Sequence, residues 1–301
     1  MTFRDQARIG SGRVRTGGGG GRRPQMAMGG VGGIIVVAVG LFFGLDLTGG
    51  GGSGSGLSSG GGAVTAQGYE RAACETGADA NADVDCRIEF TAHSLDQVWS
   101  EQLQQVGVQY QEPGVTLFRG GVTTGGCGSA GSDVGPFYCP ADDTAYFDSS
   151  FFQILEDRFG ASSGPFAQEY VVAHEFGHHI QNLLGDSGRG DYNDPGAMSA
   201  AVRSELQADC YAGVWAHYAD STPAPGDDQP LLQPLTETDI ADALSAAASV
   251  GDDHIQSRST GRVNPDSWTH GSSAQRQQWF TTGYQTGQVA ACNTFDAPDL
   301  G

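Results

Sequence analysis

The sequence predicts an α+β fold: a mainly helical domain with a small β-sheet, preceded by one transmembrane helix and a glycine-rich linker. Three observations support this prediction. Apolar residues recur every three or four positions in several long segments, which is typical of amphipathic helices. Two short segments between them are rich in β-branched and aromatic residues, as strands are. Two glycine runs and a long apolar stretch lie before residue 64.

The glycine runs indicate where folded structure begins. The chain of 301 residues contains 48 glycines, and many of them fall at Gly17 to Gly21 and at Gly49 to Gly62. Such runs behave as flexible linkers. The resulting division is a basic tail at 1–25, a transmembrane helix at 26–45, a linker at 46–63 and a folded domain at 64–301.

The predicted transmembrane helix belongs to an uncharged stretch from Pro24 to Leu45, about long enough to cross a bilayer. The six arginines of the first 47 residues precede it, so the positive-inside tendency places the N-terminus in the cytoplasm and the domain outside. A cleaved signal peptide is the alternative, although no small-x-small cleavage pattern follows Leu45. We therefore expect a single-pass protein of the cell membrane with an extracytoplasmic domain.

The charge distribution argues against nucleic acid as a partner. The formal net charge is −20, and residues 1–47 contribute +4 from six Arg against Asp5 and Asp46, so the remainder carries −24. That remainder has scattered arginines and no lysine. It offers no basic stripe that could neutralise a phosphate backbone.

All six cysteines follow the apolar stretch, in a compartment that would permit disulfides. Fifteen pairings are conceivable. We expect Cys74–Cys86 and Cys127–Cys139 to close short local loops, which leaves Cys210–Cys292 as the long-range pair. No two cysteines have the spacing of a metal finger, so a thiolate zinc site is not predicted.

Periodicity and breaker residues predict the elements of the domain. Helices are expected at Ser94–Tyr110, Phe151–Phe159, Ala197–Tyr218, Thr238–Val250 and Ser272–Tyr284. Strands are expected at Val115–Phe118 and Thr144–Phe147, with a cysteine-bracketed loop from Gly120 to Pro140 between them.

A further helix carries the chemistry. Gly164-Pro165 predicts its start and Gly185 its end. His174 and His178 are four residues apart on it, so both imidazoles can reach one Zn²⁺. Glu175 cannot bind the same ion from that position, but it can hold a water beside the metal and act as general base.

A catalytic zinc usually has three protein ligands. Glu205, on the following helix, is the predicted third ligand, and Asp209, one turn further, is predicted to accept a hydrogen bond from a ligand imidazole. The alternative for these two carboxylates is a solvated helix face. His179 is rotated by about 100° from His178 and is therefore not predicted to be a ligand.

Three segments show a resemblance to a known family: A-H-E-F-G-H-H-I-Q-N-L-L-G at 173–185, S-E-L-Q-A-D-C-Y-A-G-V-W-A at 204–216 and T-H-G-S-S-A-Q-R at 269–276. Together with segments 135–142 and 251–256, they are similar to the bacterial putative neutral zinc metallopeptidase family. The resemblance implies a zincin-like metallopeptidase domain in a single-pass membrane protein. It also implies one zinc ion bound by His174, His178 and Glu205, with Glu175 catalytic.

Peptide hydrolysis also needs a group that stabilises the oxyanion of the tetrahedral intermediate. His270 is the leading candidate, ahead of Tyr192 and His254. The strand around Tyr146 could pair with an extended peptide.

The predicted function is therefore a membrane-anchored zinc endopeptidase acting on peptide or protein substrates. A zinc-stabilised membrane scaffold without turnover and a cell-wall amidase are the alternatives. Glu175 argues against the scaffold, because a structural zinc site needs no water-activating carboxylate.

Overall fold

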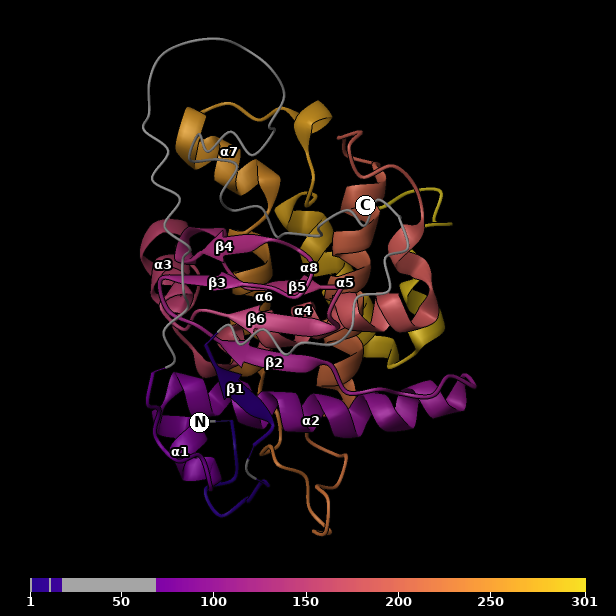
Figure 1. Cartoon of the computed structure of the whole chain (residues 1–301). Helices are drawn as coiled ribbons and strands as arrows, with labels where there is room; N and C mark the ends of the chain where they lie inside the picture. The colour runs from indigo at the N-terminus through magenta and orange to yellow at the C-terminus, as the bar shows by residue number, and fades with distance from the viewer. Residues whose placement is uncertain (1, 11, 18–68) are drawn as a thin grey trace.

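Most strands lie together in one part of the chain and most helices follow them, in the α+β arrangement of the computed structural model, which describes residues 2–10, 12–17 and 69–301 (Figure 1). The helices within these ranges are α1 (Gly77–Ala82), α2 (Val84–Gln105), α3 (Phe151–Phe159), α4 (Pro165–Leu184), α5 (Ala200–Tyr218), α6 (Glu237–Ser249), α7 (Asp252–Thr260) and α8 (Ser273–Thr286). The strands are β1 (Val14–Thr16), β2 (Gly114–Leu117), β3 (Gly121–Thr123), β4 (Ser129–Gly131), β5 (Phe137–Cys139) and β6 (Thr144–Phe147).

The main sheet has four strands in the order β1-β2-β6-β5. β1, β2 and β6 run parallel, and β5 pairs antiparallel with β6. β3 and β4 form a separate antiparallel hairpin. Because β6 has a partner on each side, the strand around Tyr146 cannot accept an extended peptide, and that prediction is wrong. The edge strand that faces α4 is β5.

Three glycines let the helices behind the sheet approach one another closely. A Cβ atom at Gly177 of α4 would lie 2.8 Å from the carbonyl oxygen of Ala208 in α5. A Cβ atom at Gly213 of α5 would lie 2.0 Å from the carbonyl oxygen of Phe280 in α8, and one at Gly283 would approach α5 equally closely. Only hydrogen fits at these positions, so α4, α5 and α8 are held with their backbones in contact.

The three predicted disulfides are confirmed, namely Cys74–Cys86, Cys127–Cys139 and Cys210–Cys292. The first joins the segment before α1 to α2. The second joins the turn between β3 and β4 to the last residue of β5. The third ties α5 to the C-terminal end of the chain.

Several elements differ from the sequence-based expectation. The helix predicted from Ser94 begins ten residues earlier, at Val84. Its first turns do not show a helical apolar pattern in the sequence, because Asp85, Arg87 and Glu89 are buried charged residues that interrupt it. Their partners include Tyr69, Gln168 and Arg71, which lie outside α2. The predicted loop at 120–140 contains β3, β4 and β5, and α1 and α7 were not predicted.

The predicted membrane arrangement is corrected. No helix among the described residues is long and apolar enough to span a membrane, which overturns both the transmembrane part of the fold class and the single-pass localisation. The stretch 26–45 and the linker 46–63 lie outside the described residues.

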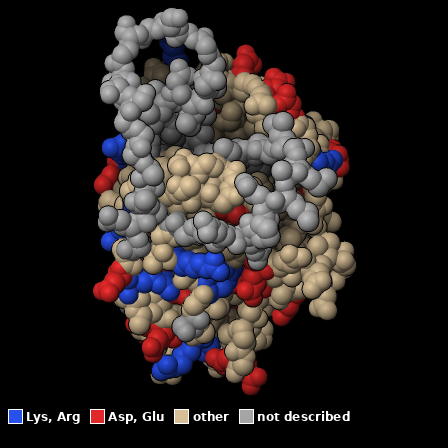
Figure 2. All heavy atoms as spheres, in the orientation of Figure 1, with Lys and Arg blue, Asp and Glu red and all other residues tan. Residues whose placement is uncertain are grey.

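The N-terminal residues also lie elsewhere than predicted. β1 pairs with β2, so residues 14–16 belong to the sheet of the domain rather than to a tail on the opposite side of a membrane. Two arginines of this part of the chain are paired with acids of the domain, Arg4 with Asp227 and Arg13 with Asp96. On the face in Figure 2, basic and acidic side chains are accordingly interspersed in the lower half, around β1 and α2.

Candidate metal centre

α4 and α5 bring three predicted ligand residues together in the interior. One ligand atom each of His174, His178 and Glu205 lies within 4.8 Å of the other two. His174 Nε2 is 3.2 Å from one carboxylate oxygen of Glu205, and His178 Nε2 is 3.5 Å from the other. All three residues are buried. The close approach of α4 to α5 at Gly177 explains how residues 31 positions apart in sequence meet across the two helices.

Hydrogen bonds orient both imidazoles so that Nε2 faces the shared space. His174 Nδ1 lies 2.8 Å from Asp209 Oδ1, and His178 Nδ1 lies 2.8 Å from Gln181 Oε1. The Gln181 amide nitrogen donates to the carbonyl of Ser204, which leaves its oxygen for His178. With acceptors at both Nδ1 atoms, each ring places a proton there, so that in its neutral form it would present a lone pair at Nε2.

The buried ligand atoms of His174, His178 and Glu205 suit a zinc ion. His178 Nε2 is buried and makes no hydrogen bond, despite facing Glu205 at 3.5 Å. An orphaned polar atom of this kind is costly unless a ligand completes it. Two imidazoles and one carboxylate are a common ligand set for catalytic zinc.

The ionisation of the three residues follows from their mutual contacts. Burial lowers the pKa of His178 to about 4, so this imidazole is neutral near pH 7. Burial raises the pKa of the Glu205 carboxyl, but the two histidines outweigh it and hold that pKa below its usual value. For His174, burial lowers the pKa, and the stronger combined influence of Asp209 and Glu205 raises it to about 9.

Glu175 lies close enough to this group for its charge to interact with His174 and Glu205. The side chain is 1% exposed, and its Oε2 makes no hydrogen bond. Burial raises the pKa of Glu175 to about 7, with a lowering contribution from His174 and a raising one from Glu205. A carboxyl group with a pKa near neutrality can both take up and release a proton at physiological pH.

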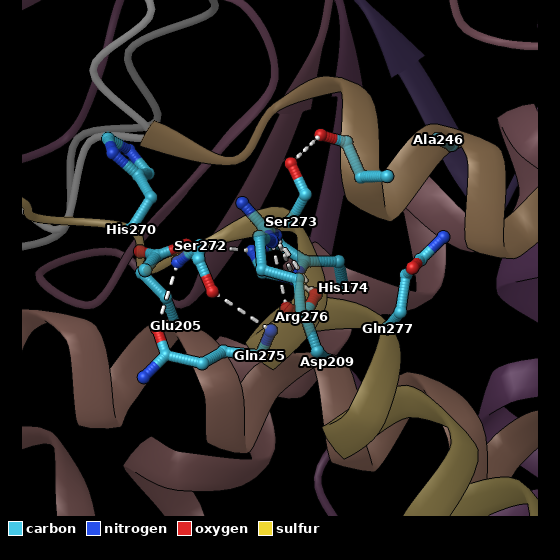
Figure 3. A network of polar contacts seen from close by, with 12 residues as sticks. His174, Glu205, Asp209, Ala246, His270, Ser272, Ser273, Gln275, Arg276 and Gln277 are labelled. Carbon is cyan, nitrogen blue, oxygen red and sulfur yellow. Dashed lines mark hydrogen bonds and ion pairs between the residues drawn. The ribbon is translucent and has the colours of Figure 1, made fainter. Parts of the chain in front are cut away.

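Asp209 connects the centre to α8 (Figure 3). It is fully buried and accepts hydrogen bonds from His174 and from the Tyr170 hydroxyl. Arg276 donates to both of its oxygens, at 2.8 and 2.9 Å. Burial raises the pKa of Asp209, but Arg276 and His174 lower it by more than burial raises it. The pKa is therefore below its usual value, and the carboxylate stays charged as an acceptor.

Arg276 and Gln181 are site residues that the sequence-based reasoning missed. Both belong to segments that carry the family resemblance, yet neither was given a role. The signal for Arg276 was a single arginine three residues before the buried Trp279–Phe280 pair of α8, where a charge needs a buried partner. For Gln181 it was a glutamine three residues after His178, on the same side of the helix.

His270 is buried in the turn before α8, close enough to Glu205 for their charges to interact (Figure 3). Its backbone nitrogen donates to Asp252 Oδ2 at 2.7 Å, and the same oxygen accepts from the backbone of Thr269 and Gly271. Burial lowers the pKa of His270, but its bond to Asp252 and the charge of Glu205 raise it overall. Asp252 therefore fixes the position of this turn.

The other candidate residues divide into two kinds. Tyr192 is half-buried beside Ser204 and Glu205, and burial raises its pKa. His254 bonds the carbonyl of Phe159, and His179 bridges Tyr138 and the carbonyl of Gln111. His179 is thus a buried link between α4, β5 and the segment before β2. Tyr192 borders the centre, and the two histidines serve packing.

Comparisons with known proteins agree with this chemistry. A family model described as "Putative neutral zinc metallopeptidase" matches residues 4–295. The chain is 58% identical over 236 residues to "Uncharacterized protein Rv2575" of Mycobacterium tuberculosis, covering 78% of this chain and 79% of that protein. It is 40% identical over 300 residues to "Uncharacterized protein YpfJ" of Escherichia coli K12, covering 97% and 94%. No solved structure matches the chain.

Proposed function

The chain belongs to the putative neutral zinc metallopeptidase family, and we propose that it is a zinc-dependent peptidase in which Glu175 is the general base. The observation that carries the proposal is the buried group of His174, His178 and Glu205, with an unpaired imidazole nitrogen facing it. One zinc ion per chain would be held by these three side chains. When bound, zinc supplies a Lewis acid that polarises a carbonyl and acidifies water.

Glu175 would take a proton from the attacking water and return it to the leaving amine. Its free oxygen, its burial and a pKa near 7 support this role. A peptide or protein is the substrate class that fits the family. A scaffold that bound zinc without turnover would have no use for a buried, unpaired carboxylate oxygen beside its metal.

Residues around the ligands would position the reaction. Asp209 would hold the His174 ring, and Arg276 would hold Asp209, through the bonds described above. His270 would stabilise the oxyanion as a hydrogen-bond donor, because it is buried near Glu205 in a turn fixed by Asp252. Tyr192 borders the same space and would be the second candidate.

A paired comparison tests catalysis apart from metal binding. Glu175→Gln keeps the shape of the side chain and removes the base, so we expect one zinc per chain and a loss of cleavage of at least about a hundredfold on a mixed peptide library. Glu156→Gln, an exposed residue of α3, is the matched control and should cleave like the wild type. Equal cleavage by Glu175→Gln and the wild type, or no cleavage by the wild type, would refute the proposal.

A further inference from the structure

Residues 2–10 and 12–17, which we call the N-terminal segment, pack into the fold near both ends of this stretch. Phe3 is fully buried, and its ring meets Phe90 of α2 edge-on with the centroids 5.3 Å apart. Val14 is buried as well, and β1 pairs with β2 in the main sheet. Apolar side chains of a segment that merely rested on the surface would remain exposed to water. The segment is therefore part of the hydrophobic core.

The N-terminal segment contacts α4 on both sides of His174. The Thr2 hydroxyl donates to a carboxyl oxygen of Glu169, five residues before His174. The guanidinium carbon of Arg13 lies 6.0 Å from the ring centroid of Phe176, two residues after His174. Glu169 and Phe176 are both fully buried. These contacts bracket the turn of α4 that carries the first predicted ligand and the predicted base.

Arg13 makes the strongest link to the rest of the molecule. Its Nε and one terminal nitrogen donate to the two oxygens of Asp96 in α2, at 2.6 and 3.1 Å. Its other terminal nitrogen donates to the carbonyl of Pro113 at 2.7 Å. Both charged side chains are almost completely buried, at 9% and 5% exposure, so the pair is shielded from solvent.

Backbone bonds hold the start of the segment in the same way. Arg4 donates its backbone N–H to the carbonyl of Leu231, and Gln233 donates to the carbonyl of Thr2. The backbone of Arg4 also passes so close to α1 that a Cβ atom at Gly77 would lie 2.0 Å from its carbonyl oxygen. All of these contacts join the segment to residues 69–301 directly.

We propose that the N-terminal segment is a positioning element of the metal centre that docks on residues 69–301 by its own contacts, without needing covalent continuity through 18–68. Docked, it holds α4 where His174 and His178 converge on Glu205. The inference rests on the metal centre of the proposed function and not on peptide hydrolysis. It also requires residues 2–17 and the domain to occupy one compartment.

Cleavage of the folded, full-length chain tests the docking. A recognition site for a specific protease is inserted between Gly56 and Leu57, and the purified zinc-loaded protein is cut after folding. We expect the two pieces to co-elute from a size-exclusion column in native buffer, with zinc per chain unchanged, and to separate only in denaturant. Separation in native buffer, with zinc retained by the larger piece, would overturn the proposal.

Substitutions in the full-length chain test the positioning. Arg13→Met should speed the loss of zinc to a chelator about tenfold or more. Arg15→Met, an exposed arginine of β1, is the matched control and should behave like the wild type. Thr2→Val removes only the hydroxyl that bonds Glu169 and keeps the Arg13–Asp96 pair. It therefore tests the other contact between the N-terminal segment and α4, and it should accelerate zinc loss less strongly than Arg13→Met.

The readout separates this inference from the proposed function. Equal rates of zinc loss in Arg13→Met, Thr2→Val and the wild type would overturn the positioning role, whatever the protein cleaves. A wild type that binds zinc and cleaves no peptide would refute the proposed function, while a faster zinc loss in Arg13→Met would still support the positioning role.

Discussion

At the scale of single residues, the centre depends on buried polar groups that complete one another. Asp209 serves His174 on one side and Arg276 on the other, and all three side chains are buried. Removing one partner of a buried ion pair leaves an uncompensated charge, which costs about 3–5 kcal/mol. We therefore expect Arg276 to act on the proposed metal site mainly through Asp209.

This chain of contacts makes Arg276→Met informative. Without the guanidinium, Asp209 loses the charge that keeps it ionised and the two bonds that fix its position. Its carboxyl group becomes easier to protonate and holds His174 less well, so zinc affinity should fall about tenfold or more. Competition with a chromogenic chelator measures the change. Arg276→Lys, which keeps the charge, should recover part of the affinity. Arg262→Met, an exposed control, should not differ from the wild type. Unchanged affinity in Arg276→Met would remove Arg276 from the site.

At the scale of elements, local signals predicted the helix that carries the motif, and long-range contacts decided the rest. Pro165 and Gly185 define the two ends of α4 as expected, because both act through the backbone at their own positions. The bond between Asp209 and Arg276 joins residues 67 positions apart, and no periodicity encodes it. In sequence, β1 resembles a basic tail, because its single buried residue, Val14, lies between two arginines and gives no apolar pattern.

The close contact between α5 and α8 gives a prediction for stability. Gly283→Ala would place a methyl group 1.9 Å from the carbonyl oxygen of Cys210, so the helices must separate. We expect a loss of roughly 1–3 kcal/mol, the usual cost of overpacking. Gly188→Ala, with no atom within 4 Å of the new Cβ, is the control and should change little. Urea unfolding of both variants measures this, and equal midpoints would contradict the packing argument.

At the scale of the whole molecule, Glu169 of α4 bonds the N-terminal segment through Thr2. Its ionisation also makes the stability of the fold depend on pH. Burial raises its pKa from 4.5 to about 8, and the bond from Thr2 and the charge of Arg87 only partly offset this. A carboxyl whose pKa is raised by folding favours the folded state fully below pH 4.5. That contribution is lost as the pH rises from about 4.5 to about 8.

Glu169→Gln removes this titration and keeps an oxygen that can accept from Thr2. The variant should therefore gain stability relative to the wild type between pH 4.5 and 8, by at most about 1.4 kcal/mol per pH unit. Below pH 4.5 the difference should stop changing with pH. Denaturant unfolding at several pH values measures it, with Glu156→Gln as the exposed control. A difference independent of pH would show that folding does not raise the pKa of Glu169.

We propose above all that the buried group of His174, His178 and Glu205 binds zinc. Elemental mass spectrometry of zinc per chain, after dialysis against zinc and desalting, tests it directly. We predict one zinc per chain in the wild type and in the exposed control Glu237→Gln, and far less than one in Glu205→Ala and His178→Ala. A wild type without zinc, or full zinc retention in both ligand variants, would contradict the assignment.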